Sequence, residues 1–270
     1  MCHAGRVQRW AIDLDGVVWR GPELLPGSAD AISRLLDAGH EVIFCTNHAQ
    51  SPETKQRELE RLGVRPCPVV TSAEAAAAQC VVGDRVLVLG DLTLVDVFRR
   101  SRFVTIDVDD LPEDGPAPEV DVVVVGARSD WDRSRVGLAA DAVRAGARFL
   151  ATNDDATFPV RGSSGRPRVL PGNGALVAAV AVTADAVPEV TGKPHAATAD
   201  LLVRRYGPID VVVGDKPETD GALAVRLGAR FALVLSGVTA ASDLPVLPDP
   251  FVVGANLSEV VDQMVDAATR

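Results

Sequence analysis

Two carboxylates stand two residues apart in the stretch RWAIDLDGVVWRG, residues 9–21. A short apolar run leads into Asp13, and Asp15 and Gly16 follow before the chain becomes apolar again. On an extended chain this spacing sends both side chains to the same face, where like charges repel. Such a pair is expected to bind a metal ion, to attack a substrate, or only to occupy a turn.

Further polar residues follow other apolar runs of the chain. Thr46 and Asn47 end one run, Asp215 ends a later one, and Lys193 lies in the loop TGKPH shortly before it. In open parallel sheets, reactive groups gather where the strands end. Carboxylates, a hydroxyl and an ammonium that meet there would handle an anion, with room for a hard cation such as Mg²⁺, which prefers carboxylate oxygens.

Each of these motifs alone also has an ordinary structural interpretation. The Asp-x-Asp-Gly stretch is compatible with a turn, but it lacks the further oxygen ligands of an EF-hand calcium loop. A threonine after a strand usually caps a helix. GNGALVAA, residues 172–179, has the look of a glycine-rich phosphate loop, but no strand is predicted directly before it, which favours a turn into a buried helix. The functional interpretation therefore rests on the motifs taken together.

The elements that must position these residues alternate between strands and helices. The expected strands are 10–14, 41–47, 85–90, 120–126, 148–153, 209–215 and 230–237. The expected helices are 28–38, 51–63, 71–80, 133–145, 174–182, 196–206 and 219–227. Residues 109–121 and 159–172 are expected to be loops. Valine-rich strands in such an alternation predict an α/β fold with a parallel sheet and right-handed crossovers.

Length and charge restrict the class of protein. A chain of 270 residues exceeds the usual single domain, so two domains or one enlarged by an insertion are expected. A net charge of −10 argues against nucleic acid as a partner, because a phosphate backbone would be repelled. The sequence contains no signal-like or membrane-spanning apolar run, and its four cysteines form no zinc spacing, so we expect a cytoplasmic protein without membrane partners.

The motifs together resemble those of the haloacid dehalogenase superfamily. DLDGVV (13–18), the dipeptide TN (46–47), GKP (192–194) and GDKPETD (214–220) match its four motifs in order. The stretches ARFLATNDD, LPGNGALVAA and LVLSGV are similar to the branch that includes p-nitrophenyl phosphatase-like, phosphoglycolate and glycerol-3-phosphate phosphatases. The resemblance implies a Rossmann-like parallel-sheet core, residues 1–78 and 191–270, with an inserted α/β cap domain of the C2 type, residues 79–190.

The resemblance also implies roles for the two carboxylates. Asp13 would be the nucleophile that forms an aspartyl-phosphate. Asp15 would protonate the leaving alcohol and then activate water. The Asp13 carboxylate, the Asp15 backbone carbonyl and Asp215 would bind Mg²⁺.

The remaining motif residues would bind the phosphoryl group. Thr46 and Lys193 would hold its oxygens, helped by backbone N–H groups near Asn47. Asp220 would orient a metal-bound water or Lys193.

Substrate contacts are expected from the cap. Asn153 and Asp155, in ATNDDATFPVRG, are candidates, and Arg161 could meet a substrate carboxylate or second anion, although a solvated basic loop explains it equally well. His48 stands where the branch often has Asn; it would either line the pocket or be a solvated histidine near it.

An aspartate at position 15 indicates hydrolysis, because relatives whose leaving group needs no proton, or whose aspartyl-phosphate persists, lack it. The predicted function is therefore a Mg²⁺-dependent phosphatase for a small phosphate ester such as glycerol-3-phosphate, phosphoglycolate or a sugar phosphate. The alternatives are a phosphotransferase or phosphomutase with the same intermediate, or a receiver-like signalling module. The substrate stays open, and caps of this type suggest a homodimer.

Overall fold

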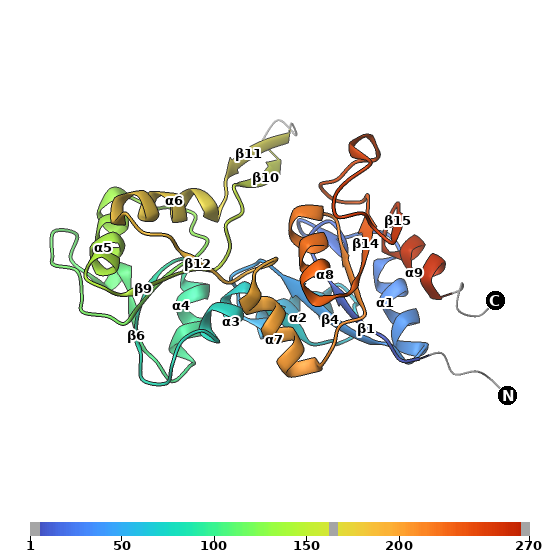
Figure 1. Ribbon diagram of the computed structural model, residues 1–270, viewed down its shortest axis with the longest axis horizontal. Coiled ribbons are helices and arrows are strands. Elements are labelled where there is room, and N and C mark those ends of the chain that lie inside the picture. The colour runs from blue at the N-terminus through green and yellow to red at the C-terminus, as the bar shows by residue number, and fades with distance from the viewer. Residues whose placement is uncertain (1–5, 162–166, 266–270) are drawn as a thin grey trace. The chain divides into compact units, whose positions relative to one another are not determined.

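The computed structural model describes residues 6–161 and 167–265, without the side chains of 158–167, as two compact units (Figure 1). Unit 1 contains the chain up to Thr46, Pro52–Val70 and the chain from Lys193 onward. Unit 2 contains Asn47–Ser51 and Thr71–Gly192. Helix α3 (Ser72–Ala77) thus belongs to unit 2, whereas the predicted core, which extends to residue 78, includes it.

Unit 1 is built on a six-stranded sheet with the strand order β15-β14-β13-β1-β4-β5. Parallel pairing joins β15, β14, β13, β1 and β4 in turn, as the valine-rich pattern predicted. The strands are β1 (Arg9–Ile12), β4 (Glu41–Thr46), β5 (Val69–Thr71), β13 (Val211–Gly214), β14 (Arg230–Val234) and β15 (Val252–Gly254).

Five helices accompany this sheet in the described residues. They are α1 (Ser28–Asp37), α2 (Pro52–Arg61), α7 (Ala196–Tyr206), α8 (Ala222–Leu227) and α9 (Leu257–Val265). Helices α1, α2 and α9 bury their apolar stripes with Trp10, Ile12 and Phe44 in one cluster. Because side chains alternate along a strand, these residues lie on one face of the sheet, and their complete burial removes their apolar surface from water.

Unit 2 has a five-stranded parallel sheet with the order β12-β9-β8-β6-β7. Its strands are β6 (Arg85–Leu89), β7 (Val104–Asp107), β8 (Val122–Val125), β9 (Arg148–Ala151) and β12 (Glu189–Val190). Its helices are α3 (Ser72–Ala77), α4 (Leu92–Arg99), α5 (Arg133–Arg144) and α6 (Asn173–Ala184).

Alternation along the strands of unit 2 divides its core into two layers. Leu87 and Val123 pack with α5 and α6, whereas Val86 and Val122 pack with α3 and α4. All of β8 is buried, so both faces of this strand are covered by helices. This is the arrangement that a continuous valine run predicts.

Two antiparallel hairpins complete the structure, and one of them corrects a prediction. β2 (Trp19–Arg20) pairs with β3 (Glu23–Leu24) directly after the Asp-x-Asp motif. β10 (Thr157–Arg161) pairs with β11 (Pro167–Pro171), so the expectation of a loop at 159–172 was wrong. β11 also runs directly into α6 through Gly172, contrary to the expectation that no strand precedes this helix. A two-stranded hairpin tolerates the prolines because it consists only of edge strands.

The sequence also missed several short elements, namely α4, β7, β12, β15 and α9. In the parts of the chain that the structure describes, no helix has both the length and the apolar character to span a bilayer.

Candidate active site

The register of the unit 1 sheet brings the predicted motifs to one edge. Ile12, the last residue of β1, pairs with Val213 on one side and Phe44 on the other. Asp13 follows Ile12, and its backbone N–H donates to the carbonyl of Val213 at 2.9 Å. Thr46 ends β4, and Asp215 follows β13 directly, so both stand at the same carboxyl edge as Asp13.

Lys193 links two of the carboxylates. Its Nζ donates to Asp13 Oδ1 at 2.6 Å and to Asp220 Oδ1 at 2.7 Å. The three side chains are buried, so these are charge-assisted hydrogen bonds shielded from water. Burial by itself would lower the pKa of Lys193, but the two carboxylates outweigh it and hold the pKa well above its usual value. Lys193 is therefore charged at neutral pH.

Three carboxylates meet at this point. Asp13, Asp215 and Asp220 each offer an oxygen, and these oxygens lie within 4.8 Å of one another. With all three carboxyl groups ionised, the one ammonium of Lys193 would leave two negative charges in a buried place. Burial raises the pKa of Asp13 well above its usual value against the pull of Lys193, and it raises the pKa of Asp215 to about 6. The donor set and the missing positive charge fit a hard divalent cation such as Mg²⁺.

Three glycines let the backbone close around these carboxylates. A Cβ on Gly237 would lie 1.8 Å from Asp215 Oδ2, and one on Gly16 would lie 2.3 Å from the same atom. A Cβ on Gly214 would lie 2.1 Å from Asp220 Cγ. Side chains at these positions would displace the carboxylates. Glycine at the three positions therefore leaves room for the carboxylate oxygens of Asp215 and Asp220.

Loop hydrogen bonds fix Asp215 and Asp220. The N–H of Val238 donates to Asp215 Oδ2 at 2.6 Å, and the Thr239 hydroxyl donates to the Asp215 carbonyl at the same distance. Asp220 lies in a single π-helical turn, Pro217–Gly221, and accepts from the N–H of Lys216 at 3.2 Å. π-helical turns are rare and often mark functional sites; here the turn directs a buried carboxylate at Lys193.

Asp15 differs from Asp13 in its surroundings. Asp13 is buried, whereas Asp15 is exposed. β1 ends at Ile12, so Asp13 and Asp15 both lie beyond the strand, and the shared face expected from strand geometry stays a prediction. The indole Nε1 of Trp19 donates to Asp15 Oδ1 at 3.1 Å.

The residues expected to make substrate contacts form a hydrogen-bonded group in unit 2. Asn47 Nδ2 donates to Asp155 Oδ2 at 3.2 Å, and Asn153 Nδ2 donates to the Asn47 carbonyl at 2.9 Å. Asn173 Nδ2 donates to the Asn153 carbonyl at 2.7 Å. These bonds tie the short segment after Thr46 to the end of β9 and the start of α6.

The other expected contact residues are His48 and Arg161. His48 is half-buried in the same segment as Asn47. The Arg161 side chain lies outside the described part of the chain.

A thiol also stands at this edge but is unsuited to nucleophilic attack. Cys45 is the buried residue before Thr46, and burial raises the pKa of its thiol to about 12. It stays protonated at neutral pH, and the thiolate rather than the thiol is the nucleophile.

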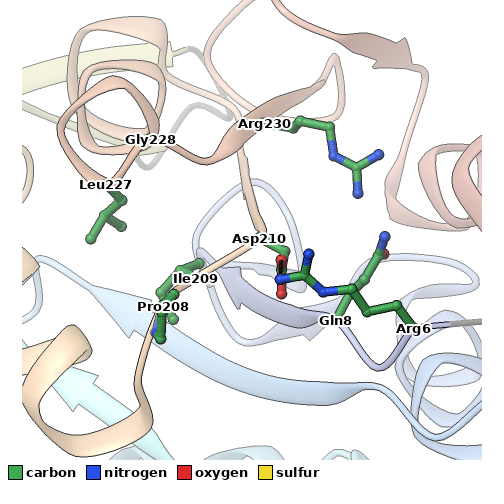
Figure 2. A pocket seen from close by; sticks show the side chains of 8 residues that line it. All are labelled: Arg6, Gln8, Pro208, Ile209, Asp210, Leu227, Gly228 and Arg230. Carbon is green, nitrogen blue, oxygen red and sulfur yellow. Dashed lines mark hydrogen bonds and ion pairs between the residues drawn. The ribbon is translucent and has the colours of Figure 1, made fainter.

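Figure 2 shows a pocket at the opposite, amino edge of the same sheet. It has a volume of about 460 Å³ and is lined by Arg6, Gln8, Pro208, Ile209, Asp210, Leu227, Gly228 and Arg230. None of the motif residues lines it. The Arg6 and Asp210 side chains form an ion pair of 3.2 Å in which Arg6 is largely exposed.

Two family models match the chain. A haloacid dehalogenase-like hydrolase model covers residues 10–103, and a second model of HAD-like hydrolases covers residues 190–260. Both matched segments contain the residues that meet at the carboxyl edge of unit 1.

Curated relatives and solved structures agree with these models. An acid sugar phosphatase of Staphylococcus saprophyticus is 30% identical over 87% of this chain and 89% of its own length. The D-glycerol 3-phosphate phosphatase of Mycobacterium tuberculosis is 33% identical over 86% of this chain, which covers 64% of that protein. A crystal structure of glycerol phosphate phosphatase from M. tuberculosis in complex with magnesium superposes with a TM-score of 0.78, at 31% identity over 95% of this chain and 77% of that one.

The chain therefore belongs to the haloacid dehalogenase-like hydrolases. Within that family it is a phosphoric monoester hydrolase, like the phosphatases it matches over most of its length. This membership sets aside the receiver-like alternative.

Sequence reasoning missed Trp19, whose indole contacts Asp15, and Lys55, whose ammonium lies near the Trp19 ring. Lys55 is almost fully buried, and its Nζ lies 5.3 Å from the centroid of the Trp19 ring. A signal was present, because Lys55 and Leu59 are four residues apart on one face of a polar helix, and Leu59 marks that face as buried.

Proposed function

We propose that this protein is a Mg²⁺-dependent phosphatase that hydrolyses a small phosphorylated metabolite through a phosphorylated Asp13. The observation that carries the proposal is the buried group of Lys193 with Asp13, Asp215 and Asp220, in which one ammonium faces three carboxylates. An anionic phosphoryl group cannot enter such a site unless further positive charge accompanies it. A divalent cation supplies that charge.

In the first half-reaction, a carboxylate oxygen of Asp13 attacks phosphorus, and the bond from phosphorus to the ester oxygen breaks. Lys193, already 2.6 Å from Asp13 Oδ1, neutralises charge on the phosphoryl oxygens, and Thr46, at the end of β4 on the same edge, would donate its hydroxyl to them. Asp15 gives its proton to the leaving alkoxide. In the second half-reaction water attacks phosphorus, Asp15 takes a proton from that water, and Asp13 is released.

Mg²⁺ would be held by the Asp13 carboxylate, the Asp15 backbone carbonyl and Asp215. When bound, the ion stabilises the negative charge that develops on the phosphoryl group. Asp220 keeps Lys193 oriented through their 2.7 Å contact.

The substrate class that we propose is the one that relatives name: a sugar phosphate, a glycerol phosphate or phosphoglycolate. The test is phosphate release from a panel of these esters by the purified protein with Mg²⁺. We expect turnover of at least one ester that chelation abolishes and Mg²⁺ restores. Failure to release phosphate from any ester, or activity indifferent to chelator, would overturn the proposal. Transfer to an added alcohol in place of water would favour the phosphotransferase.

Substitution Asp13→Asn tests the nucleophile. An amide does not form the acyl-phosphate, so we expect activity to fall by more than ~10⁴-fold, as when other covalent nucleophiles are removed. The circular dichroism spectrum should be unchanged, because Asn has nearly the same volume. Near-normal turnover by this variant would contradict the assignment.

A further inference from the structure

The indole of Trp19 lies beside the proposed acid–base group. Its Nε1 donates to Asp15 Oδ1 at 3.1 Å. The Asp15 carboxylate is exposed and lies on the loop after β1. Water therefore competes for hydrogen bonds to its oxygens, and its side chain changes rotamer at little cost in free energy. Trp19 is 4% exposed and packs in the main core of unit 1. A rigid, buried donor thus contacts an exposed carboxylate.

The backbone between the two residues is closed on itself. The Leu14 carbonyl accepts from the N–H groups of Val18 and Trp19 at 2.8 and 3.1 Å, and the Gly16 N–H donates to the Trp19 carbonyl at 2.8 Å. The Ser28 hydroxyl donates to the Val18 carbonyl at 2.9 Å and ties the loop to α1. The loop therefore holds the indole at a set distance from Asp15.

A buried cation fixes the ring from its face. Lys55 Nζ lies 5.3 Å from the ring centroid and forms an ion pair of 2.9 Å with Glu58. A cation near an aromatic face is attracted to the ring, more strongly when both are shielded from water. The positive charge also draws electron density from the ring, which makes the indole N–H a better donor.

We propose that Trp19 is a positioning residue for Asp15: its N–H occupies Oδ1, so that the proton exchanged with substrate and water is carried on Oδ2. An oxygen that already accepts a hydrogen bond is the poorer site for a proton, and fixing one oxygen also fixes the direction of the other. This inference rests on the proposed role of Asp15 in the phosphatase reaction. The inference gives Trp19 a role in catalysis in addition to its packing in the hydrophobic core of unit 1.

The leaving group provides the test. Trp19→Phe removes the N–H and keeps a ring against Lys55. An alkyl phosphate needs a proton on its leaving oxygen, whereas p-nitrophenolate leaves without one. We expect kcat for an alkyl phosphate to fall by about 10- to 100-fold with KM little changed, since general acid–base catalysis contributes ~10²–10⁴-fold. The first-turnover release of p-nitrophenolate should be almost unaffected and should appear as a burst.

A double-mutant cycle separates positioning from a structural effect. In an Asp15→Asn background, Trp19→Phe should cost nothing further if Trp19 acts through Asp15. Equal losses of the first-turnover rate for both substrates, or the same loss in both backgrounds, would overturn the proposal. If Trp19→Phe does not fold, site-specific replacement of the indole by benzothiophene keeps the shape without the N–H and gives the same readouts. Absence of phosphatase activity in the unmodified protein would instead count against the proposed function.

Discussion

The two edges of the unit 1 sheet use similar residues under opposite conditions. At the carboxyl edge, Lys193 and the carboxylates of Asp13 and Asp220 are almost fully buried. At the amino edge, Arg6 is 84% exposed in its pair with Asp210 (Figure 2), and Arg230 lies over the Phe251 ring at 5.1 Å. Both edges are formed by the ends of the same strands, and both contain acidic and basic side chains. The two edges therefore differ in the burial of their charged groups rather than in the kinds of charged residue.

The energetic expectation follows from that difference. Removing one partner of a buried pair leaves an uncompensated charge away from water, whereas an exposed pair is screened and contributes little. The buried edge should therefore respond strongly to single substitutions and to cations, and the exposed edge should not.

The largest effect is expected for Lys193→Met. Three carboxylates would then face one another without an ammonium, and losing one partner of a buried pair costs about 3–5 kcal/mol. Chemical denaturation without metal should show this loss, and phosphatase activity should disappear. Unchanged stability would mean that the site is more hydrated than the burial of Lys193 indicates.

A pair of glycine substitutions compares the edges directly. Gly237→Ala places a Cβ 1.8 Å from Asp215 Oδ2, so it should displace Asp215 and weaken activation by Mg²⁺ by at least ~10-fold, a typical effect of disturbing the groups that orient metal ligands. Gly228→Ala at the amino edge meets nothing within 4 Å, but its φ of +65° costs about 1 kcal/mol. Activity titrated with Mg²⁺ and thermal unfolding distinguish the two. Normal Mg²⁺ activation of Gly237→Ala would refute the steric argument.

The pH dependence of stability should differ with and without Mg²⁺. The pKa of Asp215 is raised from 3.8 to about 6, so between these values the folded state keeps a proton that the unfolded state releases. The metal-free protein therefore loses stability as pH rises through this window, and the full penalty applies above it. Mg²⁺ should raise the melting temperature by several degrees more at about pH 8 than at about pH 5. An equal shift at both values would contradict the involvement of Asp215.

The smallest effect is expected for Arg6→Met. Its exposed ion pair with Asp210 should contribute at most ~1 kcal/mol. Denaturation in low and high salt should give nearly the same result for the variant and the unmodified protein, and phosphatase activity should be unaltered. A larger loss of stability in Arg6→Met would contradict the expected difference between the buried and the exposed edge.

The helices and strands that were predicted correctly are those with a long, regular pattern of apolar residues. The strands at 85–89 and 122–125 and the helices at 133–144 and 196–206 lie close to their predicted bounds, because strand and helix periods are visible over such lengths. The short helix Leu92–Arg99 and strand Val104–Asp107 were missed. The hairpin of β10 and β11 was missed because its prolines indicate a loop, which an edge pair does not require.

For the site, sequence order and sheet topology predicted which residues gather at one edge. They could not predict that Asp13 is buried while Asp15 is exposed, since the exposure of Asp15 depends on the turn that follows it, where Gly16 adopts a φ of +80°. The contact of Lys55 with Trp19 joins segments separated along the chain, and local periodicity carries no information about such a pair. The roles of these residues stay predictions until the substitutions are made.

The bond from Lys193 to Asp13 also has a consequence for the order of events during synthesis. It spans 180 residues, and the whole of Thr71–Gly192 lies between the two partners. A nascent chain that ends before Lys193 carries every strand of unit 2 and the strand before Asp13, yet it lacks Lys193, Asp215 and Asp220. Closing a loop of this length also costs chain entropy that only the completed sheet can offset. Activity should therefore arise only after Lys193, Asp215 and Asp220 have been synthesised, and its appearance reports closure of this loop.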